Sequence, residues 1–293
     1  MSCTAIEKAE TLAGKQAMCR LSAAGRIGGR LAVITGGAQG FGLGIAHELY
    51  KEGATVVLAD INIKQAQIAA KDLGERAFAV EADISDQASV EHMVAKAVEY
   101  MGGIDLFVAN AGVVKTGGLD DLSAEDFDFV TRVNYTGYFL CVRAVSRIMK
   151  AQFAADGKRW YDIVQINSKS GLEGSRRNYA YAGSKFGGVG LTQSFAMELA
   201  PYQIKVNAIC PGNYYDGPLW SDPEHGLFVQ YLKAGKVPGA KTVEDVKRSY
   251  LAKSLIGRGC LPEDVAKAVF YCVEQCYETG QAIPVTGGQI MLS

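Results

Sequence analysis

The pair Tyr181 and Lys185 has the residue types and the spacing for acid–base chemistry. The lysine opens a stretch that predicts a helix over 185–200, and at a spacing of four the two side chains share one helix face, about one turn apart. A free tyrosine has a pKa of about 10, so its use as a base near neutral pH needs a fall of about two to three units, worth about 3–4 kcal/mol. One cation at about 4 Å in an effective dielectric of about 20 contributes about 4 kcal/mol, so a single lysine is about sufficient. The alternative is a surface tyrosine and lysine that happen to share a face, and the spacing alone does not separate the two.

Ser168 is a third group suited to the same site. It follows the apolar run 163–167, which predicts a buried strand. In an open parallel sheet, ligands bind outside the carboxyl ends of the strands, and Ser168 emerges at such an end. Its hydroxyl can hydrogen-bond a substrate oxygen as charge develops there.

A glycine-rich loop lies between the first predicted strand and the first predicted helix of this region. Gly36, Gly40 and Gly42 stand in the pattern G-x-x-x-G-x-G. Glycine lets the backbone approach a pyrophosphate, and the N-terminus of the following helix offers free N–H groups to it. A tight turn without a ligand is the alternative, and the position after the first strand favours the phosphate site.

Asp60 closes the second predicted strand. A carboxylate at that place can accept hydrogen bonds from both hydroxyls of an adenosine ribose and repel a 2′-phosphate. The next two residues are Ile61 and Asn62, and neither they nor the glycine loop supply a cation. We therefore expect NAD rather than NADP as the cofactor, with an ordinary turn residue as the alternative for Asp60.

The elements that must position these groups begin at residue 30. Apolar, β-branched runs at 31–35, 54–59, 77–80 and 104–108 alternate with helical patterns. Repeated strand–helix units with near-continuous apolar strands predict an α/β fold with a parallel sheet covered on both faces. The composition does not change between 30 and 293, so we expect a single domain there.

The first 29 residues lack the apolar segment of a secretory signal. We expect residues 1–29 to form a mobile or loosely docked N-terminal extension.

Composition excludes several classes of function. The chain has 293 residues, 48% hydrophobic and 21% charged, with a net charge of −1, so we expect neither a nucleic-acid nor an anionic-membrane partner. No apolar run approaches the roughly 20 residues of a membrane span. The seven cysteines form no CxxC pair and the three histidines are scattered, so we expect no metal site. Because the cysteines show no pairing pattern, we expect their thiols to be reduced and the protein to be cytoplasmic.

Several motifs together resemble the short-chain dehydrogenases/reductases. From about residue 30 to the end, the chain contains in the family's order Thr35-Gly36-x-x-x-Gly40-x-Gly42, Asp83, Asn110-Ala111-Gly112, Asn134, Ser168, Tyr181-x-x-x-Lys185 and Pro211-Gly212. Ala109 departs from the family, where many members have Asn. The resemblance implies a Rossmann-type, doubly wound sheet of about seven strands, and a dimer or tetramer. It also implies that the strand 281–285, which contains Pro284, lies at the sheet edge near a subunit contact.

The resemblance also implies roles for individual residues. Lys185 lowers the pKa of Tyr181 and contacts the nicotinamide ribose, and Asn134 sits at a local helix break and holds a water that links the lysine to solvent. For Asn134 the alternative is a side chain bonded to nearby backbone. The expected cofactor-binding residues are Gly36, Gln39, Gly40, Phe41, Gly42, Asp60, Asp83, Ile84, Asn110, Tyr181, Lys185, Pro211 and Gly212.

Two features bear on the substrate. Four cations, Lys115, Lys169, Arg176 and Arg177, belong to loops at one edge of the predicted sheet. They favour an anionic substrate, a phosphate above all, with solvated loop charge as the alternative. The segment around 213–255 corresponds to a substrate lid in the family, and its Asn213 and Tyr214 suit a hydroxyl-rich ligand.

The segment 163–194 is most similar to family members that oxidise sorbitol 6-phosphate at C2 to fructose 6-phosphate with NAD. We therefore expect a secondary alcohol of a sugar alcohol or sugar phosphate as the substrate. Unphosphorylated sugars, 3-hydroxy acids and 3-ketoacyl groups are alternatives within the family, and a non-catalytic NAD-sensing regulator is the alternative from another class.

Overall fold

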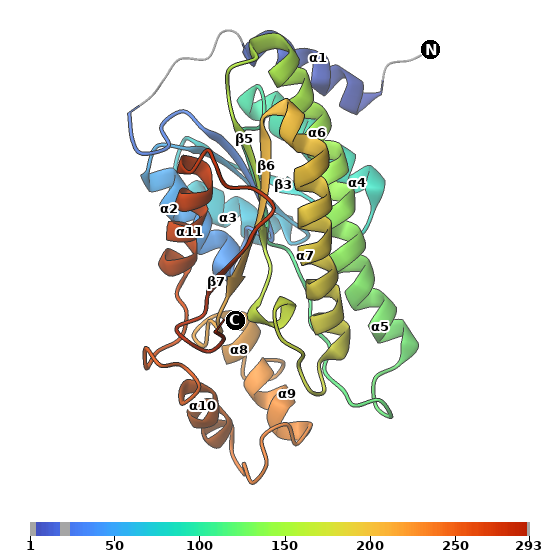
Figure 1. Cartoon of the computed structure of the whole chain (residues 1–293), viewed down its shortest axis with the longest axis vertical. Helices are drawn as coiled ribbons and strands as arrows, with labels where there is room; N and C mark the ends of the chain where they lie inside the picture. The colour runs from blue at the N-terminus through green and yellow to red at the C-terminus, as the bar shows by residue number, and fades with distance from the viewer. Residues whose placement is uncertain (1–3, 18–23, 292–293) are drawn as a thin grey trace.

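The computed structural model describes residues 4–17 and 24–291 and contains a seven-stranded parallel sheet (Figure 1). The order of the strands is β3-β2-β1-β4-β5-β6-β7. The strands are β1 (Leu31–Thr35), β2 (Thr55–Asp60), β3 (Ala77–Glu81), β4 (Leu106–Ala109), β5 (Tyr161–Ile166), β6 (Ile204–Pro211) and β7 (Ala282–Val285). This confirms the α/β, doubly wound fold class, and β7, with Pro284, lies at an edge as expected.

The strand order reverses between β1 and β4. From β1 the chain adds β2 and β3 on one side, and from β4 it adds β5, β6 and β7 on the other. In an open α/β sheet the crevice for a ligand lies at such a switch point, outside the carboxyl ends of the strands. The topology therefore locates the site before any side chain is considered.

Both faces of the sheet are covered by helices. Because side chains alternate along a strand, Phe107 and Val108 of β4 enter different cores. The core with Phe107 receives α4 (Gln87–Met101), α6 (Gly137–Asp156) and α7 (Tyr179–Leu199), and the core with Val108 receives α2 (Gly40–Lys51), α3 (Ile63–Leu73) and α11 (Pro262–Glu274). Strands buried on both sides need continuous apolar runs, which is the pattern seen in the sequence.

The N-terminal segment differs from the expectation of a mobile or loosely docked extension. Residues Ala5–Ala17 form helix α1, which packs on α4 and α6 and buries Ile6, Ala9 and Ala13 in the core. Glu10 accepts hydrogen bonds from Arg147 of α6, at 2.6 Å to Nε. The buried face of α1 consists mainly of alanines. Alanines form only a weak hydrophobic pattern in a sequence, so the burial of this face could not be recognised without the structure of α4 and α6, which it packs against. Residues 1–3 and 18–23, with Cys3 and Cys19, lie outside the described ranges.

One long helical segment crosses the middle of the chain, with a local change of winding. α5 (Ala124–Thr131) continues into a π-helical turn, η1 (Arg132–Thr136), and then into α6. Asn134 lies in this turn, so the expected local break is present. Such turns often occur at functional sites.

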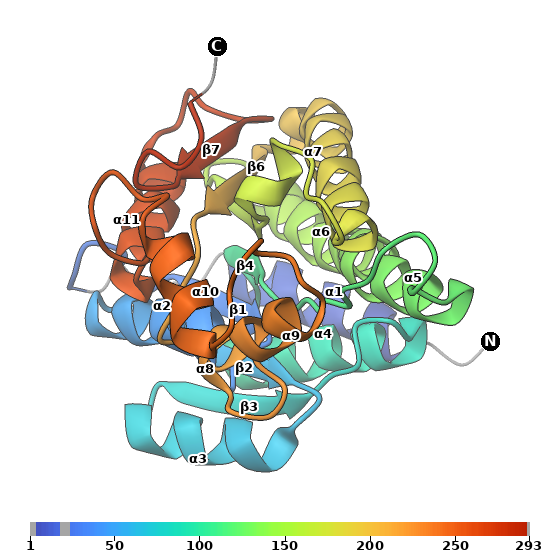
Figure 2. The ribbon, with the colours of Figure 1, turned by 90° about the horizontal axis from the view of Figure 1, so that it is seen from below.

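Three short helices lie across the carboxyl ends of the strands (Figure 2). They are α8 (Pro218–Ser221), α9 (Leu227–Lys233) and α10 (Val243–Leu251). Tyr215, Trp220, Tyr231 and Tyr250 are among the buried residues of a separate aromatic cluster that holds these helices together. We call the segment 213–255 the lid.

Two single turns complete the fold: η2 (Lys169–Gly171) follows β5, and η3 (Ala200–Tyr202) follows α7. None of the helices in the described ranges is long and apolar enough to cross a membrane.

Candidate active site

A cleft of about 690 Å³ lies at the carboxyl ends of the strands, beneath the lid. The glycine loop after β1 lines it together with β-strand ends, the start of α7 and the lid. Of the residues predicted from the sequence, those that line the cleft are Gly36, Gln39, Gly40, Phe41, Asp60, Asp83, Ile84, Asn110, Ser168, Tyr181, Lys185, Pro211, Gly212, Asn213 and Tyr214. The fold thus brings residues from the whole length of the chain to one place.

The glycine loop has two different requirements for glycine. At Gly40 φ is +58°, and a Cβ would meet nothing within 4 Å, so a side chain there would project into open space beside the cleft. At Gly42 a Cβ would lie 2.1 Å from the Gly36 carbonyl oxygen and 2.5 Å from Asn110 Nδ2. Gly42 does not line the cleft, and its absence of a side chain permits the loop to close on Asn110.

Asn110 and Thr35 hold this loop in place. Asn110 Nδ2 donates to the carbonyl oxygens of Thr35 at 2.9 Å and Gly36 at 3.1 Å. The Thr35 hydroxyl accepts from the backbone N–H groups of Asn110 and Ala111, both at 3.1 Å. No role for Thr35 was predicted from the sequence, although its position directly before the first glycine of the loop is a usable signal.

Two carboxylates stand at the ends of the neighbouring strands. Asp60 accepts from the N–H groups of Ala38 at 3.0 Å and Asn62 at 2.9 Å. Asp83 accepts from the N–H of Ser85 at 2.9 Å and from its hydroxyl at 2.7 Å. Backbone N–H groups therefore orient each carboxylate. Because a carboxylate has about four acceptor positions, both Asp60 and Asp83 can accept further hydrogen bonds from a ligand in the cleft.

Tyr181 and Ser168 meet inside the cleft. Tyr181 lies in the first turn of α7, and its hydroxyl is hydrogen-bonded to the Ser168 side chain. Burial raises the pKa of Tyr181, and the hydrogen bond with Ser168 lowers it by less. The phenol is therefore held in its protonated form in the structure as it stands.

Lys185 is buried one turn further along α7. Its ammonium donates to the Ile166 carbonyl oxygen at 3.0 Å and lies 5.5 Å from the centre of the Tyr181 ring. Burial lowers the pKa of Lys185 to about 8. This differs from the expected electrostatics, in which the lysine lowers the pKa of Tyr181. The expectation placed the ammonium at about 4 Å from the phenol oxygen, whereas in the fold the ammonium is directed to a carbonyl and is itself desolvated.

Asn134 is bonded to protein rather than exposed to the cleft. Its Oδ1 accepts from the Val113 N–H at 2.8 Å, and its Nδ2 donates to the Val113 carbonyl at 2.9 Å and to Ser184 Oγ at 3.2 Å. The alternative of a side chain bonded to nearby backbone is thus what the structure contains. A Cβ at Gly112 would lie 3.2 Å from Asn134 Oδ1 and 3.8 Å from Lys185 Nζ, so the amide and the ammonium approach the same point of the backbone.

Asn167 holds Ser168 and Lys185 in place relative to each other, a role that was not predicted from the sequence. Its Oδ1 accepts from the Ser168 N–H at 2.8 Å, and its Nδ2 donates to the Lys185 carbonyl at 2.9 Å. One buried amide therefore fixes the strand end that carries the serine relative to the helix that carries the lysine. Its position directly before Ser168 was the available signal.

The structure separates the four cations predicted to bind substrate. Lys115 is ion-paired with Asp126 at 3.2 Å, and Arg177 donates to the Ala234 carbonyl at 2.6 Å. Arg176 is exposed, and none of these three lines the cleft. Lys169 does not line it either, but it lies between Ser168 and Ser170, which do.

The lid contributes several groups to the cleft. Tyr214 stacks on Phe41 in the first turn of α2, with ring centres 5.1 Å apart, and Asn213 Nδ2 donates to the Tyr215 hydroxyl at 3.1 Å. Asn178, at the start of α7, is buried and lines the cleft, and among the described residues its Oδ1 has no hydrogen-bond partner. Because buried polar atoms are normally hydrogen-bonded, we expect a water or a ligand in the cleft to supply the partner.

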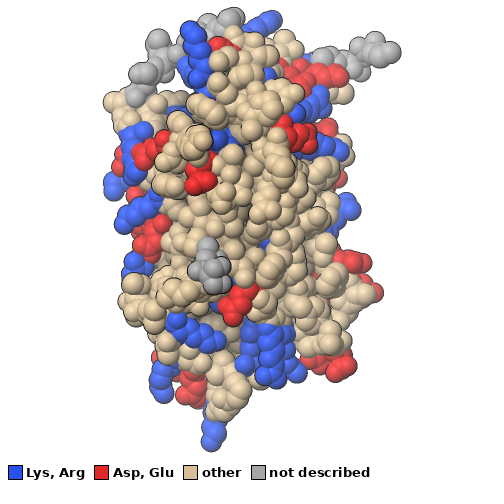
Figure 3. All heavy atoms as spheres, in the orientation of Figure 1, with Lys and Arg blue, Asp and Glu red and all other residues tan. Residues whose placement is uncertain are grey.

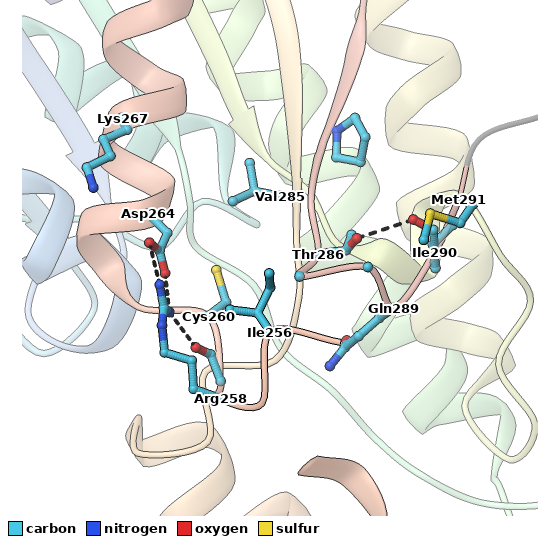
Figure 4. A pocket seen from close by; sticks show the side chains of 14 residues that line it. Ile256, Arg258, Cys260, Asp264, Lys267, Val285, Thr286, Gln289, Ile290 and Met291 are labelled. Carbon is cyan, nitrogen blue, oxygen red and sulfur yellow. Dashed lines mark hydrogen bonds and ion pairs between the residues drawn. The ribbon is translucent and has the colours of Figure 1, made fainter. Parts of the chain in front are cut away.

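A second cavity, of about 490 Å³, lies between α11 and the C-terminal segment (Figure 4). Its charged residues include Arg258 and Asp264, which are paired with each other. None of the residues predicted for catalysis, cofactor or substrate lines this cavity. We therefore locate the chemistry in the larger cleft.

Comparisons with known proteins show which family the chain resembles. The profile of the family described as short chain dehydrogenase matches residues 30–220. A sorbitol-6-phosphate 2-dehydrogenase of Escherichia coli K12 is 39% identical over 270 residues, 89% of this chain and 99% of that protein. A galactitol 2-dehydrogenase of Agrobacterium fabrum is 35% identical over 270 residues, 91% of this chain and 99% of that protein.

Two solved structures extend the comparison. The crystal structure of sorbitol-6-phosphate 2-dehydrogenase from Erwinia amylovora has a TM-score of 0.81 and 38% identity, and covers 89% of this chain and 100% of that one. The 3-ketoacyl-(acyl-carrier-protein) reductase from Brucella melitensis, complexed with NADH, has a TM-score of 0.76 and 30% identity, and covers 90% of this chain and 99% of that one.

Proposed function

Because the chain belongs to the short-chain dehydrogenase/reductase family, we propose that it is an NAD-dependent dehydrogenase of a sugar alcohol or sugar phosphate. The family and its named dehydrogenase relatives make it an oxidoreductase acting on CH–OH groups. The finer proposal is that it interconverts sorbitol 6-phosphate and fructose 6-phosphate.

One observation carries the proposal: Ser168, Tyr181 and Lys185 meet in the same cleft as the glycine loop. A proton-transfer group and a dinucleotide cradle in one cleft are the two parts that oxidation of an alcohol by hydride transfer needs.

The residues present fit a nicotinamide dinucleotide. The space beside Gly40 is open and a side chain there would fill it, while the loop it belongs to precedes the N-terminus of α2. Asp60 and Asp83 line the cleft with carboxylates that can accept hydroxyl and amino donors of an adenosine. We infer NAD rather than NADP because Asp60 would repel a 2′-phosphate and no cation follows it at residues 61 and 62.

The chain's own residues then divide the work on the substrate. Bound NAD supplies the acceptor for the hydride. Tyr181 Oη takes the proton of the substrate hydroxyl during oxidation and returns it during reduction. Ser168 orients the substrate oxygen through the hydroxyl that it presents beside the phenol. The charge of Lys185, 5.5 Å from the centre of the Tyr181 ring, does not lower the pKa of the resting phenol but stabilises the negative charge that develops on it during proton transfer. We assign to Asn134 the support of the proton path, through the backbone that it fixes at Val113.

Several features favour a polyol as substrate. Asn178, Asn213 and Tyr214 place amide and phenol groups around the cleft, and each can bond a hydroxyl. The relatives named as dehydrogenases of sorbitol 6-phosphate and galactitol are of similar length and align over nearly all of it. A homo-oligomer, dimer or tetramer, and a cytoplasmic location complete the proposal.

The test is NADH formation with sorbitol 6-phosphate, sorbitol, galactitol and 3-hydroxybutyrate. We expect sorbitol 6-phosphate to have the highest kcat/KM. The variant Tyr181→Phe is expected to lose about 10³-fold or more in kcat because the proton acceptor is gone, while it still binds NADH by fluorescence titration.

The matched control is Tyr179→Phe, two residues away, because its hydroxyl donates to the Gly118 carbonyl at 2.8 Å rather than to Ser168. We expect this variant to stay within about threefold of the wild type, since a neutral hydrogen bond contributes about 1 kcal/mol. Activity retained by Tyr181→Phe would refute the catalytic assignment, and no NAD reduction with any of the substrates would favour a non-catalytic NAD sensor.

A further inference from the structure

Lys169, Lys236 and Lys253 form a group of cations beside the catalytic cleft, which we call the lysine cluster. Lys169 belongs to η2, Lys236 follows α9 and Lys253 follows α10. Figure 3 shows Lys and Arg side chains gathered at the lower end of the molecule, where Figure 1 places the lid. Lys169 and Lys253 are 84 positions apart in the sequence (253 − 169), with Lys236 between them. Only the fold therefore brings the three lysines together.

Two stacked tyrosines organise the cluster. The rings of Tyr231 and Tyr250 are 5.4 Å apart, with an interplanar angle of 25°. Lys236 Nζ lies 4.0 Å from the centre of the Tyr231 ring, and Lys253 Nζ lies 4.2 Å from the centre of the Tyr250 ring. The two ammonium groups are thus positioned by cation–π contacts with a rigid aromatic pair.

The cluster adjoins the cleft in two places. Tyr231 lines the cleft and also contacts Lys236. Lys169 lies between Ser168 and Ser170, both of which line the cleft. The cluster therefore borders the cleft at Ser168, Ser170 and Tyr231, although its three lysines are not among the lining residues.

The three cations of the cluster have no carboxylate partner in the part of the chain that the structure describes. Among the described residues, no carboxylate lies within 4 Å of any of the three ammonium groups, whereas Lys115 and Arg177 at the same end of the sheet are paired with Asp126 and Asp121. Lys236 donates to the neutral hydroxyl of Ser175 at 3.3 Å.

The exposed carboxylate of Glu173 interacts with Lys169 and acts to raise the pKa of that lysine. Burial and the neighbouring ammonium groups lower the pKa of Lys236 to about 8 and lower that of Lys169. The cluster therefore holds uncompensated positive charge.

We propose that the lysine cluster binds the phosphate group of the substrate. The inference rests on the proposed function and names the part of the substrate that this part of the site recognises. Three ammonium groups can donate to the three terminal oxygens of a phosphate. A phosphate carries about two negative charges near neutral pH, which suits several cations better than the single charge of a carboxylate does.

The test compares KM for sorbitol 6-phosphate and for sorbitol in Lys236→Met, Lys253→Met and the wild type. A charge-assisted hydrogen bond contributes enough that we expect KM for sorbitol 6-phosphate to rise about 10- to 100-fold in Lys236→Met, with kcat within about threefold. KM for sorbitol should change by less than about threefold. The variant Lys236→Arg should recover most of the affinity because it keeps the charge.

The matched control is Lys233→Met, in the last turn of α9, whose lysine is exposed and outside the cluster. It should leave both KM values within about twofold of the wild type. Equal KM changes for the two substrates in Lys236→Met, or no change for either, would overturn the proposal, because the lysine would then be structural or irrelevant.

A direct binding measurement separates this proposal from the proposed function. Inorganic phosphate should bind the wild type in calorimetry and bind the double variant Lys236→Met/Lys253→Met at least about 10-fold more weakly. Failure of the wild type to reduce NAD with any polyol would refute the proposed function and leave the calorimetric comparison to decide on the phosphate site. Absence of phosphate binding, or equal binding by the double variant, would refute the phosphate site even if sorbitol is oxidised.

Discussion

Two buried lysines lie at opposite ends of the sheet and have opposite surroundings. Lys205 is near the amino end of β6, where its ammonium lies 3.0 Å from Asp162 Oδ1 and donates to the carbonyl oxygens of Cys272 and, at 2.8 Å, Gln275. Lys185 is at the carboxyl end, where it donates to one carbonyl, that of Ile166. Both side chains are at most 5% exposed.

The difference separates a lysine whose charge is satisfied by the fold from the lysine that we propose to be catalytic. A buried charge with several acceptors and a counter-ion is stabilised in its ionised form, whereas one with a single acceptor retains most of its desolvation penalty. Accordingly burial lowers the pKa of Lys185 to about 8. An ammonium that the protein leaves under-satisfied can still respond to a developing phenolate or to a ligand.

The largest expected effect is on stability and follows from replacing Lys205, whose buried charge has a counter-ion and several hydrogen-bond acceptors. Lys205→Met should reduce the free energy of unfolding by about 3–5 kcal/mol, because the buried carboxylate of Asp162 loses its nearer counter-ion and keeps only Arg30, at 3.9 Å. Denaturant unfolding followed by circular dichroism measures it, and the double variant Lys205→Met/Asp162→Asn should recover part of the loss. A reduction below about 1 kcal/mol would remove the contrast between the two lysines.

The loss in Lys205→Met should depend on pH. Burial raises the pKa of Asp162 from 3.8 to about 6, against the lowering effect of Lys205. A carboxyl with a raised folded pKa contributes stability that is fully present below about pH 4, the unfolded value, and is lost as the pH rises through the folded value of about 6. Removal of Lys205 raises this pKa further, so the deficit of the variant should be larger at pH 8 than at pH 5.

The second effect is on activity. Lys185→Met should lose about 100-fold in kcat/KM, equivalent to about 2.7 kcal/mol, because the charge that favours the phenolate is gone. At pH 7 its free energy of unfolding should be at least that of the wild type, since a desolvated ammonium is removed. A variant that loses stability as Lys205→Met does would show that Lys185 is structural too.

The third effect is a pH dependence of stability that follows from Lys185 alone. Its folded pKa of about 8 is below the value of 10.5 for an ordinary lysine, so between these values the unfolded chain binds a proton that the folded protein has released. The stabilising contribution is therefore full above about pH 10.5 and is lost as the pH falls through about 8.

Between pH 8 and 9.5 the wild type should accordingly gain about 2 kcal/mol relative to Lys185→Met. Unfolding curves of both proteins across this range measure the difference. A constant difference between the two proteins would mean that the lysine keeps its ordinary pKa.

The smallest effect concerns the contacts around the catalytic end. Ser184 Oγ donates to the Tyr181 carbonyl at 2.8 Å and accepts from Asn134 Nδ2. Ser184→Ala should cost about 1 kcal/mol of stability and about threefold in kcat, because both partners keep other hydrogen bonds. Ser194→Ala is the control on the same helix, since its hydroxyl is exposed and bonded to Gly190. Equal effects of the two substitutions would mean that Ser184 does not support the site.

The fold class followed from local pattern and was confirmed. Continuous apolar strands such as 31–35 and 161–166 are needed where a sheet is covered on both sides, and they are visible without any knowledge of the neighbours. Helix α1 was not predicted as part of the core, because Ala9 and Ala13 are apolar contacts only against the groove that α4 and α6 provide.

The positions of the candidate site residues could be predicted from the sequence, but their electrostatic surroundings could not. Ser168, Tyr181 and Lys185 could be located at a strand end and a helix start, and the fold brings them to one cleft. The sign of the pKa shift of Tyr181 could not be predicted, because it depends on how deeply the fold buries the phenol and on the hydrogen bond that directs Lys185 to the Ile166 carbonyl.

By itself the sequence determined which residues share a strand end, a loop or a helix face, because those relations depend on spacing along the backbone. Only the tertiary structure decided which cations are neutralised and which are not. Lys115 has Asp126 beside it, while Lys169 meets Lys236 and Lys253. The physical reason is that charge pairing and burial depend on distances between segments far apart in the chain, and folding alone sets those distances.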